Sequence, residues 1–166
     1  MKVSRRRGEV RLRLEPVEVH VLSTVFTELA DALEADALPA TDPVRQRLFP
    51  AGYRDDAAAA TEFRDLTESS LRSERTERAR RCVVEVAQDA DEAAARGVDL
   101  HLDADGGTRW ITALNDVRLV LGTRLGITED EMGDVDDESD PPHAQQRALY
   151  FWLTTLQDSL VQALMP

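Results

Sequence analysis

The chain has 166 residues and a formal net charge of −12, with 42% hydrophobic, 31% charged and 5% aromatic residues. This length suits one hydrophobic core, and we predict that residues 1–166 form a single domain. Such an acidic balance disfavours nucleic acids and anionic membranes, unless basic side chains gather on one face. No apolar run is long enough to cross a bilayer or to act as a secretory signal. We therefore expect a cytoplasmic protein without a membrane partner.

The chain opens with a basic cluster, which we interpret as an N-terminal arm spanning residues 1–8. Two interpretations of this arm remain open. A solvated, partly frayed terminus is the simpler one and is favoured. The other is an arm that contacts phosphate or an acidic partner. The cluster consists of Lys2, Arg5, Arg6 and Arg7.

Two short segments alternate apolar and polar residues, which is the period of a β-strand. In residues 9–14 the polar positions include Arg11 and Arg13, whereas residues 98–102 place Asp99 among their polar positions. Opposite charges attract across a strand pair. We therefore predict that these two segments pair as a small two-stranded sheet.

Apolar residues at steps of three and four, with helix-start signals, predict about five to six helices, one of them central. The sequence predicts a mainly α fold, a helical bundle with the two-stranded sheet. The central helix lies within 110–127 and stops at Gly126, after a turn signal at 105–107. The other helices are expected at 16–36, from 43 to before 50, from about 56 to a break at Ser69 or Ser70, from that break to 95, and from 141 to 164.

Arginines crowd the segment before Cys82, and two interpretations compete. A solvent face stabilised by Glu74–Arg78 and Glu77–Arg81 ion pairs is favoured over a binding patch. Cys82 lies on a narrow stripe of small apolar side chains, which predicts a buried, inert thiol. As the chain has no second cysteine, an internal disulfide is excluded. The candidate interaction residues here are Arg72, Arg75, Arg78, Arg80 and Arg81.

The last helix carries a leucine-rich stripe, and Tyr150 and Phe151 lie off it. These two aromatic residues are candidates for core packing or for a homodimer contact, and truncation after Tyr150 is expected to unfold the domain. The central helix carries polar residues on a largely apolar segment, and we expect Asp116 to bind an arginine or a backbone amide, because an unpaired buried carboxylate is unfavourable. The candidate structural polar residues are Asn115, Asp116, Arg118 and Arg124.

No pattern in the chain indicates a catalytic site, a cofactor site or a metal site. The acidic loop at 129–142 lacks the glycine and glutamate positions of an EF-hand. His20, His101 and His143 lie far apart, and no glycine-rich phosphate loop or nucleophile motif is present. We therefore predict that the protein is not an enzyme and needs no cofactor.

Two segments resemble an actinobacterial family of uncharacterised domains that is often encoded beside the ClpS adaptor. WITALNDVRLVLGTRLGI at 110–127 is similar to WxxALNDxRLxLGTRLGI, and YFWLTTLQDSLVQAL at 150–164 is similar to YxWLxxLQxSLVxAL. Residues 52–67 also fit. Some members are described as oxidative-stress transcriptional regulators of the AosR type. The resemblance implies a regulatory role, but a disulfide switch would need a second thiol besides Cys82.

Two functions are favoured at this point, and an enzyme keeps a small share that a deep pocket lined by titrating groups would raise. The first is a regulatory or adaptor protein that binds another protein, in stress-response transcription or proteolysis. The second is a transcriptional regulator that touches DNA directly through the basic arm and the arginine-rich helix, which the net charge of −12 disfavours.

Overall fold

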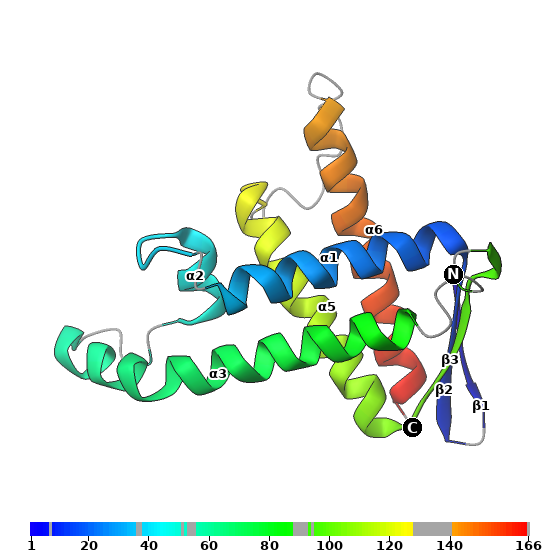
Figure 1. Ribbon diagram of the computed structural model, residues 1–166, viewed down its shortest axis with the longest axis horizontal. Coiled ribbons are helices and arrows are strands. Elements are labelled where there is room, and N and C mark those ends of the chain that lie inside the picture. Colours follow the sequence, from blue (N-terminus) through cyan, green and yellow to red (C-terminus); the bar gives the residue numbers. More distant parts are fainter. Residues whose placement is uncertain are drawn as a thin grey trace.

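The computed structural model describes residues 1–6, 8–35, 38–50, 52, 56–87, 93, 95–127 and 141–165. Over these ranges the chain forms five helices and one three-stranded antiparallel sheet (Figure 1). Residues 129–140 of the acidic loop predicted at 129–142 lie outside them, and the prediction is wrong for residues 141–142, which begin the last helix. The elements are β1 (Lys2–Arg6), β2 (Glu9–Leu14), α1 (Pro16–Glu34), α2 (Pro43–Leu48), α3 (Ala57–Val86), β3 (Val98–Leu102), α5 (Ala104–Arg124) and α6 (Pro141–Leu164).

The sheet has one strand more than the sequence predicted. The basic segment that we expected to be an arm is strand β1, which pairs with β2 from Lys2 opposite Arg13 to Arg6 opposite Glu9. Val3 is the one apolar residue within β1, so the strand carries little period-two signal. An edge strand needs little apolar content because the ladder of backbone hydrogen bonds holds it.

The predicted pairing of residues 9–14 with 98–102 is confirmed, with β2 antiparallel to β3. Across this pair Arg11 donates from Nε to Oδ1 of Asp99 at 2.7 Å. That hydrogen bond and the guanidinium charge lower the pKa of Asp99. Asp103, which we also expected to pair with an arginine of β2, is the N-cap of α5, where its carboxylate accepts from the backbone N–H of Gly106 at 2.7 Å.

The core lies where one face of the sheet meets α1, α5 and α6. Figure 1 shows the strands at one end of the molecule, with α1 and α3 running side by side across the face of α5. The ring of Phe26 on α1 meets the indole of Trp110 on α5 edge to face, at 5.6 Å between centroids, and both residues are completely buried. The sheet contributes Val10, Leu12, Leu14, Leu100 and Leu102, and α6 contributes Leu153, Leu156 and Leu160.

The predicted break at Ser69 or Ser70 is wrong, because α3 is one continuous helix of 30 residues. Serine is compatible with the interior of this helix because its hydroxyl can donate to a carbonyl one turn back. Ser73 does this to the carbonyl of Ser69 at 3.1 Å. The true N-cap is Asp56, whose carboxylate accepts from two backbone N–H groups. The helix ends at Val86, earlier than predicted.

The turn predicted at 105–107 is also wrong, because α5 begins at Ala104 and includes both glycines in its first turn. A glycine fits here for a packing reason. A Cβ placed on Gly107 would lie 2.8 Å from the side chain of Leu164, so the absence of a side chain lets α6 approach closely. The predicted stop at Gly126 is confirmed, because this glycine has a φ of +65° and follows the C-cap residue Leu125.

Replacing Gly97 with alanine is expected to destabilise the domain by several kcal/mol. Gly97 has a φ of +77°, and a Cβ there would lie 2.0 Å from the carbonyl oxygen of Leu14. Gly126→Ala is the matched control, since its φ is also positive but nothing lies within 4 Å. Urea denaturation should therefore show a loss of about 1–2 kcal/mol for Gly126→Ala and a clearly larger one for Gly97→Ala. Equal losses would contradict this.

Candidate interaction surface

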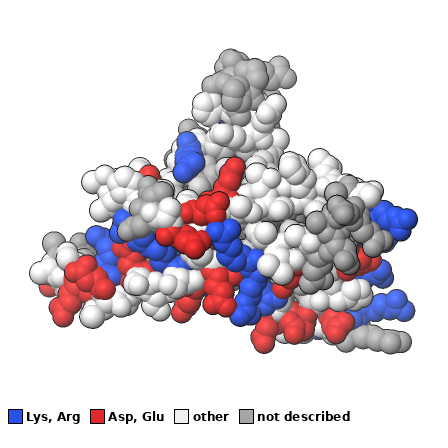
Figure 2. All heavy atoms as spheres, viewed as in Figure 1, with Lys and Arg blue, Asp and Glu red and all other residues white. Residues whose placement is uncertain are grey.

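The five candidate arginines lie on α3, and each contacts a carboxylate of the same chain. The predicted pair of Arg81 with Glu77 is present at 2.6 Å, but Arg78 contacts Asp116 on α5 instead of Glu74. Charges of both signs intermingle over this region (Figure 2). The contacts join Arg72 to Glu68, Arg75 and Arg78 to Asp116, Arg80 to Asp31 and Glu34, and Arg81 to Glu77.

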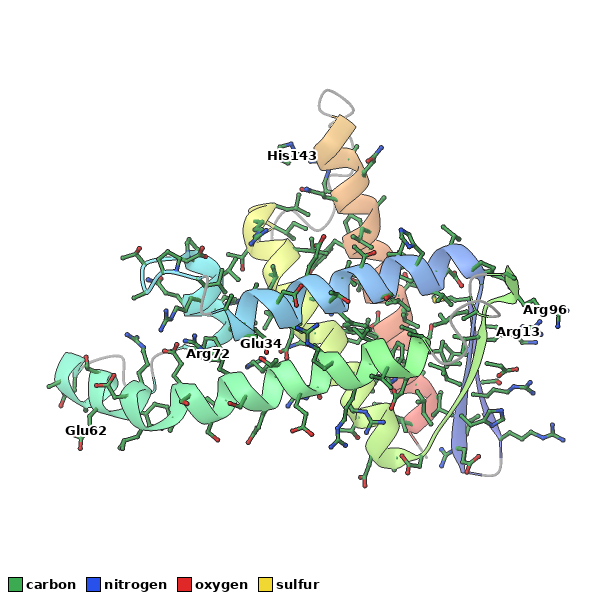
Figure 3. All side chains as sticks on the ribbon, in the orientation of Figure 1. Arg13, Glu34, Glu62, Arg72, Arg96 and His143 are labelled. Carbon is green, nitrogen blue, oxygen red and sulfur yellow. The ribbon has the colours of Figure 1, made fainter. Side chains whose placement is uncertain are left out.

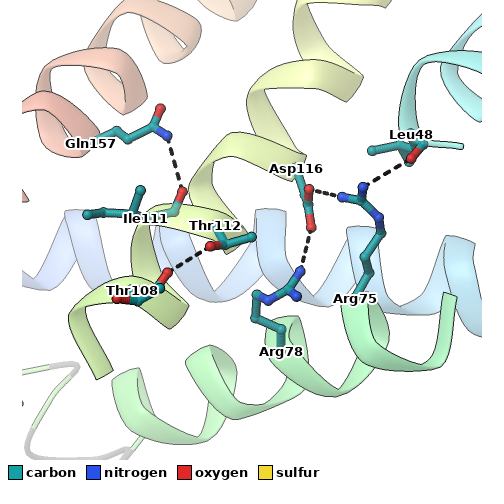
Figure 4. A network of polar contacts seen from close by, with 8 residues as sticks. All are labelled: Leu48, Arg75, Arg78, Thr108, Ile111, Thr112, Asp116 and Gln157. Atoms are coloured by element: carbon teal, nitrogen blue, oxygen red, sulfur yellow. Dashed lines mark hydrogen bonds and ion pairs between the residues drawn. The ribbon is translucent and has the colours of Figure 1, made fainter. Parts of the chain in front are cut away.

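The centre of this array is the Asp116 cluster, formed by Asp116, Arg75 and Arg78 (Figure 4). Asp116 is 1% exposed, and its two carboxylate oxygens accept separately from the two guanidiniums, at 3.2 Å from Arg78. Arg75 also donates to the backbone carbonyl of Leu48 at 3.0 Å. Burial raises the pKa of Asp116, although both arginines act in the opposite direction. The cluster therefore joins α2, α3 and α5 at a buried point, and the arginine contact expected of Asp116 is present.

A second ionic contact point lies where α2 meets α3. Glu68 is 7% exposed and accepts from Arg72 at 2.5 Å and from Arg45 at 2.6 Å. The guanidiniums of Arg72 and Arg75 also lie over the ring of Phe49, at 5.8 and 5.6 Å from its centroid. A cation over an aromatic face is stabilised by the ring quadrupole. These contacts explain why Arg72 and Arg75 point toward α2.

Cys82 lies one turn before Glu85 on the core-facing side of α3 and is completely buried. Glu85 accepts from the indole N–H of Trp110 at 2.6 Å and from Arg109 at 2.5 Å. Burial, with the nearby charge of Glu85, raises the pKa of Cys82 to about 12. The thiolate form is therefore strongly disfavoured at neutral pH, and the thiol is buried as the sequence predicted.

We expect Cys82 to react with a disulfide reagent such as DTNB at least about a thousandfold more slowly in the folded than in the unfolded protein. Near pH 8, a thiol with a pKa of about 12 holds roughly a thousandth of the thiolate of an ordinary cysteine. Burial slows the reaction further. The measurement is the absorbance change on mixing, with native protein and with protein in concentrated guanidinium. Rapid labelling of the native protein would contradict it.

The candidate polar residues of α5 divide into buried and exposed ones. Arg118 donates to Oε1 of Gln157 on α6, and the amide of Gln157 donates to the carbonyl of Ile111 at 3.1 Å. The same guanidinium lies 5.2 Å from the ring centroid of Tyr150. Asn115 is half-buried, whereas Arg124 is exposed. Arg118 thus joins α5 to α6 and covers one side of Tyr150.

The two aromatic candidates of α6 are partly buried within the chain itself. Tyr150 packs so closely on α5 that a Cβ added to Gly122 would lie 3.2 Å from its ring. Phe151 meets Tyr150 edge to face at 5.7 Å. The ring of Tyr150 is therefore engaged inside the chain.

The segment that contains β1 and β2 has a large excess of basic over acidic residues. Residues 1–14 contain six of the twenty Lys and Arg residues and one of the thirty-two Asp and Glu residues. Lys and Arg atoms project at the end of the molecule where the sheet lies (Figure 2), and Arg13 points away from the helices (Figure 3). This basic surface is separate from the arginines of α3, which are turned toward carboxylates.

The described surface also contains shallow hollows. One of about 360 Å³ between α3 and α5 is lined by side chains of both signs, including Glu77, Arg81 and Asp105. An apolar groove of about 380 Å³ lies between α1 and α6, lined by Val17, Val21, Leu149 and Trp152 among others. Among the described residues, no group of three or more His, Cys, Asp or Glu side chains is placed to hold a metal ion.

Sequence reasoning missed three polar residues that complete these contacts, namely Glu68, Glu85 and Gln157. Signals in the sequence pointed to them. Glu85 follows Cys82 by one turn on an otherwise apolar helix face, and Gln157 follows Leu156 and Leu153 on the leucine stripe of α6. A polar residue on an apolar face needs a buried partner. Glu68 stands four residues before Arg72, a spacing that indicates their ion pair, whereas its contact with Arg45 joins two helices and leaves no signal in the sequence.

The fold and its contacts define a mainly helical domain with a small antiparallel sheet and a buried ionic cluster at its centre. The chain belongs to the family described as domain of unknown function DUF2017, whose model matches residues 1–164. It is 35% identical over 135 residues to the oxidative stress regulator AosR of Mycobacterium bovis and of two Mycobacterium tuberculosis strains. The match covers 75% of this chain and 59% of each relative. No solved structure matches.

Among the helices of the described ranges, none is both long enough and apolar enough to span a membrane.

Proposed function

We propose that this protein is a non-enzymatic regulator of the stress response that acts in the cytoplasm by binding another protein. The name of the mycobacterial relatives supports the stress-response part. The observation that carries the choice of a protein partner is the arginine array of α3, in which each arginine contacts a carboxylate of the chain. Arginines held in this way contribute little to phosphate binding. With a net charge of −12, a component of the transcription machinery is a better partner than DNA.

The properties of Cys82 indicate how the stress signal reaches this protein. It is the one cysteine of the sequence, it is completely buried, and burial raises its pKa to about 12. Oxidation begins at a thiolate that the oxidant can reach. We propose that the signal reaches this protein through its partner rather than through oxidation of Cys82.

Chemical cross-linking in cells exposed to peroxide, followed by purification of the tagged protein under denaturing conditions, tests the proposed function. We expect one protein to be cross-linked in clear excess over others, and the Cys82→Ala variant to give the same product. Recovery of the tagged protein alone would contradict a protein partner. Recovery as a cross-linked homodimer would assign the contact to a second copy, for which Tyr150 and Phe151 are the candidate residues.

A second candidate function is direct DNA binding by the basic β1–β2 pair, favoured by the six basic residues within positions 1–14. A labelled duplex titrated with purified protein distinguishes it from the first. If the protein contacts phosphates, its affinity for the duplex must fall steeply as the salt concentration rises. We expect no duplex binding at micromolar protein concentrations and physiological salt. Salt-dependent binding that Arg13→Glu abolishes would instead support this second function.

A further inference from the structure

Strand β1 lies at the edge of the sheet. The strand order is β1-β2-β3, so β1 pairs with β2 on one side, and among the described elements no other strand pairs with it. An edge strand presents backbone N–H and C=O groups to solvent, and an extended peptide can add to such an edge through main-chain hydrogen bonds.

The outer face of this edge is basic. Side chains alternate along a strand, so Lys2, Ser4 and Arg6 share the face that turns away from the core. In the register of the sheet, Lys2 lies directly opposite Arg13, and Ser4 lies opposite Arg11. Like charges directly across a strand pair are unfavourable. The Lys2–Arg13 juxtaposition is therefore not explained by the stability of the sheet.

Only some of these charges are compensated within the described part of the chain. Arg11 binds the carboxylate of Asp99, and the terminal amine of Met1 binds Glu18 at 2.7 Å. Lys2, Arg6 and Arg13 form no ion pair with a described carboxylate. Glu9 lies opposite Arg6, and Asp99 lies opposite Arg13 but is bound by Arg11. A protein of net charge −12 thus presents several cations without an ion-pair partner along one strand edge.

We infer that the β1 edge binds an extended acidic segment of the partner protein, which adds to the sheet as a further strand. Carboxylates at alternate positions of that segment face Lys2 and Arg6, with Arg13 in the adjacent row. The backbone hydrogen bonds supply affinity, and the alternating carboxylates supply specificity. This inference rests on the proposed function, namely that the partner is a protein.

The shape of the basic area favours a single extended chain over duplex DNA. The two strands that carry the basic residues, β1 and β2, span roughly 10 Å across the sheet. This width fits one or two added strands and is narrower than a DNA duplex. The next strand is β3, and the hollow beside it is lined by Glu9, Glu85 and Asp103 among other residues. These carboxylates would repel phosphates that lie across the sheet. Basic residues on an edge also discourage pairing between copies of this chain, because their own β1 edges repel each other.

Fluorescence anisotropy with a labelled ten-residue peptide of alternating Asp and Thr tests the inference. The comparison probes are a peptide of the same composition in two blocks, the alternating peptide with N-methyl groups on every second amide, and a labelled DNA duplex. We expect the alternating peptide to bind at least about tenfold more tightly than the block and N-methylated peptides. Equal binding of the alternating and block peptides would overturn strand addition. Tighter binding of the duplex would assign the surface to nucleic acid and also overturn it.

The variant Lys2→Glu separates binding from folding. It places opposite charges across from each other at Lys2 and Arg13, so its melting temperature should equal that of the parent or exceed it slightly. Its affinity for the alternating peptide should fall about tenfold or more. Arg124→Glu is the matched control, since it makes the same charge change at an exposed residue of α5. A Lys2→Glu variant that binds as well as Arg124→Glu would overturn the inference.

The two proposals fail in distinguishable ways. Cross-linking of Lys2→Glu in peroxide-treated cells should lose the partner that the parent protein recovers. If Lys2→Glu recovers the same protein, the edge of β1 is not the contact and the proposed function stands. If the parent recovers no protein, the proposed function itself fails.

Discussion

Deleting residues 151–166 is expected to abolish cooperative folding of the domain. The deletion removes Leu153, Leu156 and Leu160, whose side chains are completely buried. Replacing one buried leucine by alanine costs about 2–5 kcal/mol, so three such losses total about 6–15 kcal/mol, which is comparable to the 5–15 kcal/mol that stabilises a typical domain. The exposed sheet face and the unpaired Arg118 would add to the loss. Circular dichroism during thermal unfolding checks this, and we expect a broad, non-cooperative signal.

A chain that ends at Leu164 is the control for this deletion. It retains the three buried leucines and the contact of Leu164 with Gly107, and it removes the exposed Met165 with the final residue. We expect it to unfold cooperatively, with a small change in midpoint from the loss of the hydrogen bond that Arg5 donates to the Met165 carbonyl. A soluble protein ending at residue 150 with a sharp unfolding transition would refute the role given to α6.

Apolar periodicity was sufficient to predict most elements of the fold. Each of α1, α5, α6, β2 and β3 buries one face. The spacing of apolar residues in the sequence shows which face that is, as a stripe in a helix or as alternation in a strand. Strand β1 has Val3 as its one apolar residue, so its pairing with β2 depends on backbone hydrogen bonds that leave no residue pattern. The wrong prediction of a helix break at Ser69 or Ser70 has a similar origin, because a serine hydroxyl can either cap the end of a helix or donate to a carbonyl inside one.

Partners across an interface between helices could be predicted by type and not by identity. A carboxylate on the apolar face of α5 had to bind a donor, and Asp116 does. Arg78, however, had Glu74 within reach on its own helix and binds Asp116 across the interface. Local spacing suggests the first pair, whereas the buried carboxylate gains more from a second guanidinium than an exposed Glu74 would. Such choices depend on which helices meet, and helix packing follows from the whole chain.

Asp116→Ala is expected to destabilise the domain by about 3–5 kcal/mol, because it leaves the guanidiniums of Arg75 and Arg78 without their shared carboxylate. Both arginine side chains are about one-fifth exposed, at 20% and 22%, so water can solvate them only in part. The hydrogen bond from Arg75 to the Leu48 carbonyl would also weaken, which loosens α2. Urea denaturation of the purified variant measures the change in the free energy of unfolding.

Glu77→Ala is the matched control, because it removes the carboxylate of an exposed pair whose side chains are 64% and 61% exposed. Exposed ion pairs contribute about 0–1 kcal/mol, so the two substitutions should differ severalfold. The double variant Asp116→Ala with Arg75→Ala should recover part of the loss, since a buried charge without a partner is worse than no charge at that position. If Asp116→Ala and Glu77→Ala lower the stability equally, the Asp116 cluster does not hold α2, α3 and α5 together.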